Sequence, residues 1–126
     1  MGKNELIRCR VAACREVLGD GKGWSFYLIN DGGTPLDSAV LSEVISEWGD
    51  CGSSEAADVR VIGLAPGAHA LIWRDDGEFR IELSLLVRVG EREARLSFEF
   101  PKLYIQRNLR LVGWLGKPGL EEAAEA

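Results

Sequence analysis

Few side chains in this sequence have the chemistry of a catalytic group, and His69 is the only histidine among the 126 residues. It lies just after a Pro-Gly turn, and Cys51 lies in a second predicted loop. A cysteine nucleophile needs a base within hydrogen-bonding reach, but no motif brings these two loops together. We therefore expect His69 to be an ordinary surface or hydrogen-bonded side chain, and we expect the protein not to be an enzyme.

Four acidic residues in predicted loops are the only other candidates for chemistry. They are Asp31, Asp37, Asp75 and Asp76. These carboxylates could bind Ca²⁺ if their loops lay at one end of the fold, but the ordered ligand spacing of a calcium loop is absent. Loop aspartates commonly form turns, so we expect no metal site and no cofactor.

The three cysteines, Cys9, Cys14 and Cys51, include no CxxC pair. Cys9 and Cys14 are five positions apart, so on one strand they face opposite sides and cannot form a disulfide. Reduced thiols are typical of a reducing compartment, and the opening residues MGKNELIRCR lack the apolar core of a signal peptide. No apolar run approaches the ~20 residues that cross a bilayer. We expect a cytoplasmic protein without a membrane association.

The net charge of −5 disfavours nucleic acid as a partner, because such binding depends on neutralising phosphates. A stretch of basic and aromatic residues near the C-terminus could contact RNA, but a solvated strand face explains it equally well. Its members are Lys102, Tyr104, Arg107, Arg110, Trp114 and Lys117. The final residues EEAAEA are acidic, so we expect one domain over residues 1–118 and a flexible tail over 119–126.

The elements that must position any site are strands, and residues 63–101 show this most clearly. Apolar residues alternate with polar ones from Phe79 to Val89 and again from Ala94 to Phe100. Asp76-Gly77 suits a tight hairpin turn that would join Phe79–Val89 to a preceding strand over Ala70–Arg74. The stretch therefore predicts a β-meander of three consecutive antiparallel strands.

Other strands are predicted over residues 5–17, 24–30, 58–63 and 103–111, with a loop over 49–57. Residues 36–48 are ambiguous. Leu36, Val40, Leu41, Val44, Ile45 and Trp48 recur at helical spacing, which favours an α+β fold with one helix over residues 35–48. As a strand, Leu36, Val40, Val44 and Trp48 share the core face, and Leu41 lies on the other face. The surrounding strands favour this second interpretation, which we adopt.

Two turns at a fixed order along the chain resemble bacterial immunoglobulin-like β-sandwich modules, including those related to adhesion. A strand ends in Asn-Asp-Gly before Pro-Leu, and a later strand enters Leu-x-Pro-Gly. The matching residues are Asn30, Gly32, Pro35, Leu36, Leu64, Pro66 and Gly67. The resemblance covers residues 24–89 and implies an all-β, immunoglobulin-like antiparallel sandwich of seven to eight strands. That family has no shared catalytic residues to carry over.

Function then depends on which side chains the sandwich leaves at its surface. Apolar residues on faces expected to point outward, Tyr27, Ile29, Leu41 and Leu86, suggest a non-catalytic interaction or structural module. It would bind a protein partner or form a homodimer through a sheet face or edge. The alternative is a carbohydrate or small-ligand binder that uses Trp48 and Trp114, which adjoin glycines near strand ends.

Overall fold

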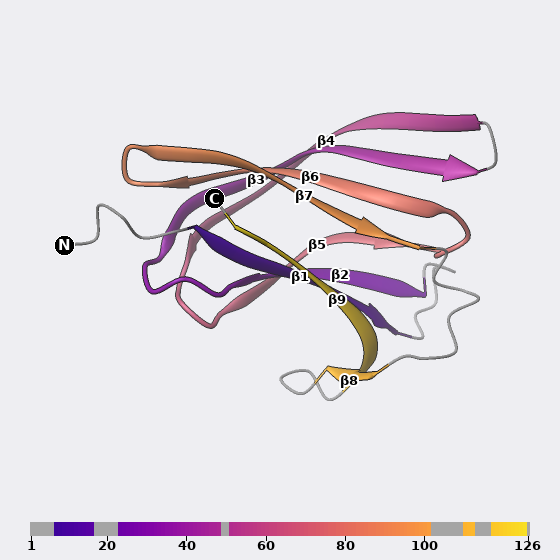
Figure 1. Ribbon diagram of the computed structural model, residues 1–126, viewed down its shortest axis with the longest axis horizontal. Helices are drawn as coiled ribbons and strands as arrows, with labels where there is room; N and C mark the ends of the chain where they lie inside the picture. Colours follow the sequence, from indigo (N-terminus) through magenta and orange to yellow (C-terminus); the bar gives the residue numbers. More distant parts are fainter. Residues whose placement is uncertain (1–6, 17–22, 49–50, 102–109, 113–116, 126) are drawn as a thin grey trace.

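The computed structural model describes residues 7–16, 23–48, 51–101, 110–112 and 117–125, with side chains at all of these except 48, 51, 110–112 and 117–119. The described residues form two antiparallel sheets, which Figure 1 shows as an upper and a lower layer. In this part of the chain no helix is long and apolar enough to cross a membrane. The all-β prediction is confirmed, and the architecture is a β-sandwich.

Sheet A has five strands in the order β5-β2-β1-β9-β8. Their bounds are β5 (His69–Asp75), β2 (Trp24–Asn30), β1 (Arg8–Arg15), β9 (Lys117–Glu125) and β8 (Arg110–Val112). Sheet B has four strands in the order β4-β3-β6-β7. Their bounds are β4 (Cys51–Leu64), β3 (Leu36–Trp48), β6 (Arg80–Val89) and β7 (Arg92–Phe100).

The core lies between the sheets and is built from every second residue of the central strands. Ile81, Leu83, Leu85 and Val87 of β6 are all buried, which confirms the alternation read from the sequence. Phe26 of sheet A meets Phe100 of sheet B edge to face, with ring centroids 5.2 Å apart. Such pairs add to the stability gained from burying the rings themselves.

Residues 36–48 form strand β3, so the helix alternative is wrong. The predicted facings of Leu41 and Val40 are also wrong, since Val40 lies opposite Leu86 and away from the core. Leu41 is fully buried in the core, as is Val44, although the two are three positions apart. The register of β3 against β4 and β6 shifts between Leu41 and Glu43. Such a bulge changes the phase of the strand, and it lets Leu41 and Val44 both face inward. The same irregular spacing of apolar residues had suggested a helix.

The predicted three-stranded meander is wrong for its first strand. β6 and β7 do form a hairpin, with Val89 opposite Arg92. β5, however, lies in sheet A and pairs with β2, so the chain crosses between the sheets after Asp75. The Asp-Gly turn is present, since Gly77 has φ 78 and its amide donates to Asp75 Oδ2 at 2.9 Å. A turn of this kind reverses the chain locally but does not determine which sheet the next strand joins.

Two segments that were expected to be irregular are strands. Most of the predicted loop over residues 49–57 belongs to β4, because Cys51–Ala56 pair with β3. The predicted tail beyond residue 118 belongs to β9, which pairs with β1 from Arg8↔Glu125 to Cys14↔Gly119. Composition suggested loops at both places, but a neighbouring strand with unpaired amides and carbonyls can recruit even a polar, glutamate-rich segment. The strand predicted over residues 103–111 lies almost wholly outside the described residues; only its end falls in β8.

The residues that carry the immunoglobulin-like resemblance meet in space around Asn30, which is fully buried at the end of β2. Its side-chain amide donates to the carbonyls of Thr34 and Leu64 at 2.8 and 3.0 Å. The backbone carbonyl of Asn30 accepts a hydrogen bond from the backbone amide of Gly67 at 2.7 Å. Gly67 has φ 78, the left-handed position that a type II Pro-Gly turn requires. Asn30 thus joins the end of β2 in sheet A to the end of β4 in sheet B.

Candidate interaction surface

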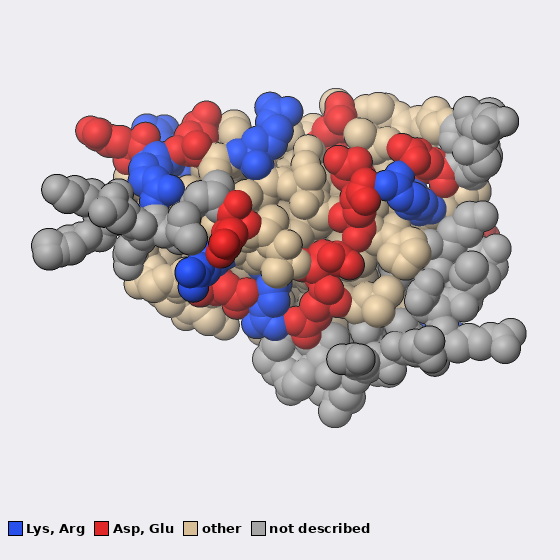
Figure 2. Space-filling model, viewed as in Figure 1, with Lys and Arg blue, Asp and Glu red and all other residues tan. Residues whose placement is uncertain are grey.

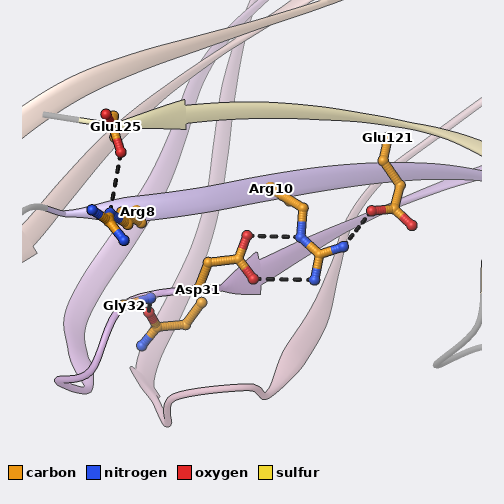
Figure 3. Close-up of polar contacts among 7 residues, drawn as sticks. Arg8, Arg10, Asp31, Gly32, Glu121 and Glu125 are labelled. Carbon is orange, nitrogen blue, oxygen red and sulfur yellow. Dashed lines mark hydrogen bonds and ion pairs between the residues drawn. The ribbon is translucent and has the colours of Figure 1, made fainter.

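The outer face of sheet A carries charges that neutralise one another. Arg10, on the central strand β1, donates from Nε and Nη2 to the two carboxylate oxygens of Asp31 at 2.7 and 3.1 Å, and from Nη1 to Glu121. Arg8 pairs with Glu125 at 3.1 Å. Figure 3 shows Arg10 between its two carboxylates, and Figure 2 shows acidic and basic side chains side by side over β1 and β9. The pKa of Arg10 is raised, chiefly by the hydrogen bond to Asp31.

Next to these ion pairs, the same face holds a small buried cluster of Ala12, Cys14 and Ile29, against which Tyr27 packs. The Tyr27 hydroxyl donates to Glu16 Oε1 at 2.5 Å, and its ring meets His69 edge to face at 5.7 Å. Burial, with the Glu16 hydrogen bond as a second cause, raises the pKa of Tyr27 to about 12. The cluster is a second, smaller core on the outside of sheet A, and Leu71, opposite Tyr27 on β5, stays 47% exposed on the same face.

The four loop aspartates do not come together. Ile29 lies opposite His69 and Trp24 opposite Asp75, so Asp75 and Asp31 lie at opposite ends of β2. Asp37 instead accepts the Gly90 amide at 2.5 Å, and Asp76 accepts a neighbouring amide in its own turn. Within the described ranges no group of three histidine, cysteine, aspartate or glutamate side chains is placed to hold a metal ion. Asp31 is an ion-pair partner, Asp75 and Asp76 accept amides within their own turn, and Asp37 binds the turn between β6 and β7.

A cavity of about 540 Å³ opens at the end of sheet A where β1 begins and β9 ends. It is lined by Arg8, Cys9, Asp31, Ala123, Ala124 and Glu125. Cys9 is almost fully buried and unbridged, and burial, with the Asp31 charge as a second cause, raises its pKa to about 12. A thiol with so high a pKa is almost entirely protonated near neutral pH and is a poor nucleophile. The side chain of Cys51, the other cysteine weighed as a nucleophile beside His69, lies outside the described residues.

The outer face of sheet B differs, because it exposes apolar side chains beside arginines. One row crosses all four strands in the order Arg60, Val40, Leu86 and Arg95. Val40 and Leu86 are half-buried, while both arginines are exposed. Neither Arg60 nor Arg95 forms an ion pair with any residue that the structure describes. One row further along, Ile62 is 67% exposed, more than any other described large hydrophobic residue.

The other half of this face is acidic. Ile45, Glu82 and Glu99 form a second row across β3, β6 and β7. Here Arg80 donates to Glu47 at 2.6 Å and also to Glu99, and the bond to Glu99 is the main cause of a raised Arg80 pKa. Between the two rows lie Ser84 and Ser97, whose hydroxyl oxygens are 3.5 Å apart. Glu43 of β3 lies opposite Ser84 in the same middle row. The face therefore has a basic, apolar half and an acidic half, and the acidic character extends into the row between them.

The six residues predicted from the sequence to form an interaction surface do not form one patch. Leu86 lies on the outer face of sheet B and Tyr27 on that of sheet A, both half-buried. Ile29 and Leu41 are buried, so neither belongs to a surface. The side chain of Trp48 and the whole of Trp114 lie outside the described residues.

Sequence reasoning missed Arg60, Ile62 and Arg95 as surface candidates. A signal was present, because alternation over residues 58–63 places Arg60 and Ile62 together, opposite Val59 and Val61. What the sequence could not provide is the pairing that sets Arg60 in line with Val40, Leu86 and Arg95.

Comparison of the sequence with models of known protein families finds no matching family, and comparison with curated proteins finds no match. The immunoglobulin-like resemblance therefore stays a prediction made from the turn residues.

Proposed function

We propose that the protein is a non-catalytic interaction module of the immunoglobulin-like kind, and that it binds a protein partner through the outer face of sheet B. The observation that carries the proposal is the row of Val40 and Leu86 between Arg60 and Arg95, next to the exposed Ile62. An apolar centre with charged residues at its rim is the usual composition of a protein interface. Arg60 and Arg95, which form no ion pair with the described residues, supply groups that a partner's carboxylates can bind.

The outer face of sheet A supports the choice of sheet B by contrast. Arg8 and Arg10 already have partners within the chain, and Ala12, Cys14 and Ile29 are enclosed, which leaves Leu71 as the exposed large apolar residue described on this face. Binding there would have to replace existing ion pairs, which gains little free energy. Binding on sheet B would instead add contacts that the isolated chain lacks.

The experiment replaces Ile62 with a photo-crosslinking amino acid and illuminates cells that express the protein. The matched control carries the same amino acid at Leu71, which is 47% exposed on the outer face of sheet A. We expect a protein adduct, with either another protein or a second copy, from position 62 and at most a trace from position 71. Equal yields at the two positions, or no adduct at position 62, would contradict the proposal.

A further inference from the structure

We infer that a second copy of this chain pairs with the edge of sheet B, so that β4 of one copy lies antiparallel to β4 of the other, with Val59 opposite Val59 at a twofold axis perpendicular to the sheet. β4 is an edge strand, and one of its sides has no neighbouring strand among the described residues. Such a side presents unpaired amides and carbonyls to which another strand can pair. The inference goes beyond the proposed function, which concerns the outer face of the sheet and not its edge.

The first argument is the regularity of β4 over residues 56–62. Exposed and half-buried side chains alternate strictly along this stretch. Ala57, Val59 and Val61 are the half-buried residues, and they pack against the core. The register of β4 against β3 shifts within this stretch, but the shift does not interrupt the alternation. The free side of β4 can therefore pair in a regular register.

The second argument is charge, because Asp58 and Arg60 flank Val59 with opposite signs. Opposed residues of an antiparallel pair share a face, and a perpendicular twofold axis keeps both outer faces on the same side. With Val59 opposite itself, Arg60 lies opposite Asp58 of the second copy, and symmetry repeats the pair. An axis at Asp58 or at Arg60 would oppose like charges, which destabilise a strand pair. An axis at Ala57 or at Val61 would lose both ion pairs, so charge selects the register centred on Val59.

The third argument is that all other pairs in this register are apolar. On the core side, Val59 meets its own counterpart, and Val61 lies opposite Ala57 of the second copy. On the outer side, the exposed Ile62 lies opposite Ala56 of the second copy. Every pair over residues 56–62 is thus either apolar or oppositely charged. Pairing would also cover valines that the single copy leaves half-buried, which extends the core across the axis.

The dimer is expected to be reversible and to leave the outer face accessible. Seven residues on each strand form about six to eight inter-strand hydrogen bonds. This contact is smaller than the roughly 800 Å² per partner of a standard interface. The two four-stranded sheets join into one, with Val40, Leu86 and Arg95 of each copy still open to a partner. The guanidinium of Arg60 has five donors, so it can bind a partner's carboxylate as well as Asp58.

The first test detects the register by disulfide formation in full-length protein that carries Cys51→Ser, since Cys9 and Cys14 are buried. Val59→Cys places two thiols opposite each other across the axis, at a separation that a disulfide spans. The matched control, Val61→Cys, lies on the same face of the same strand, but its counterpart is roughly 14 Å further along. Mild oxidation and non-reducing electrophoresis should give about tenfold more covalent dimer for Val59→Cys.

The second test reverses charges and measures the dimer by sedimentation equilibrium. Asp58→Arg and Arg60→Asp each oppose like charges, and we expect each to raise the dimer dissociation constant about tenfold. Asp58→Arg makes the chain less negative, so its weaker dimer could not arise from net charge. An equimolar mixture of the two variants again sets arginine opposite aspartate at both places and should recover to within about threefold of the native constant. The control Arg8→Asp, on sheet A, should leave the dimer unchanged.

Three results would overturn the inference. They are a native protein that is monomeric at the highest concentration reached, equal disulfide yields at positions 59 and 61, and a mixture no more dimeric than the single variants. Circular dichroism of every variant separates these results from unfolding. An adduct between position 62 and a different protein would still support the proposed function if the dimer failed. Equal photo-adducts at positions 62 and 71 would contradict the proposed function but not the dimer, which the Val59→Cys disulfide measures.

Discussion

The two outer faces of the sandwich distribute similar residues in different ways. On sheet A, each described ion pair joins side chains of the same face, and Ile29 and Cys14 are enclosed beside Tyr27. On sheet B, Arg60 and Arg95 form no ion pair with described residues, and Ile62 is exposed. The described arginines Arg8 and Arg10 on sheet A thus pair within the chain, whereas Arg60 and Arg95 on sheet B are the arginines to which the proposed function assigns a partner.

The largest expected effect is a loss of stability at high pH, which arises from the buried thiol of Cys9 in sheet A. The unfolded chain loses the Cys9 proton near pH 9, but the folded protein keeps it until about pH 12. The contribution of Cys9 to stability should therefore be constant below pH 9 and fall as the pH rises from 9 to 12, by up to about 4 kcal/mol at the upper end. Urea titrations at stepwise pH should show this decline, and it should be smaller in Cys9→Ala. An identical decline in that variant would mean that other groups cause it.

The next prediction concerns Asn30, whose side chain joins the end of β2 in sheet A to the end of β4 in sheet B. Asn30→Ala leaves the carbonyls of Thr34 and Leu64 without their donor, and we expect a loss of about 3 kcal/mol in the free energy of unfolding. Asn30→Asp keeps the oxygen that accepts the Gly32 amide but not the donors. Both variants should lose most of this energy in urea denaturation. Near-native stability of Asn30→Asp would show that the donated bonds contribute little.

A matched pair of isoleucines sharpens the comparison directly. Ile29→Ala removes a buried side chain from the outer face of sheet A and should cost about 2 kcal/mol. Ile62→Ala removes an exposed side chain from sheet B and should change monomer stability by less than about 0.5 kcal/mol. Thermal and urea unfolding at low protein concentration measure both. If the two variants were equally destabilised, the two faces would not differ as described.

The smallest expected changes in stability come from replacing one arginine on each outer face, Arg10 on sheet A and Arg95 on sheet B. Arg10→Met breaks the bonds to Asp31 and Glu121 and should cost about 1 kcal/mol, an amount that shrinks in high salt. Arg95→Met loses no ion pair within the described chain and should be neutral for monomer stability while it weakens association. Urea titrations at low and at molar salt check the first statement. A loss for Arg95→Met equal to that for Arg10→Met would remove the distinction between the faces.

Local patterns in the sequence predicted the buried rows of β6 and β7 and the two turns at Asn30 and Gly67, because these depend on neighbours along the chain. Pairing between distant strands was not predictable in the same way. β5 joins sheet A although an Asp-Gly turn follows it, and Leu41 faces the core because of a bulge. The interaction surface depends on that pairing, since Arg60 and Arg95 come from strands at opposite edges of sheet B. This is why single-strand reasoning found Leu86 but not the arginines in its row.

The place of β1 in sheet A also bears on how the chain reaches its fold. β1 lies between β2 and β9, and its pairing with β9 joins Arg8 to Glu125. Contacts so far apart in sequence have a large loop-closure cost and slow the rate-limiting step of folding. During synthesis, one edge of β1 must wait until β9 has been made. In that interval the edge has unpaired amides and carbonyls, which are a template for pairing with another strand.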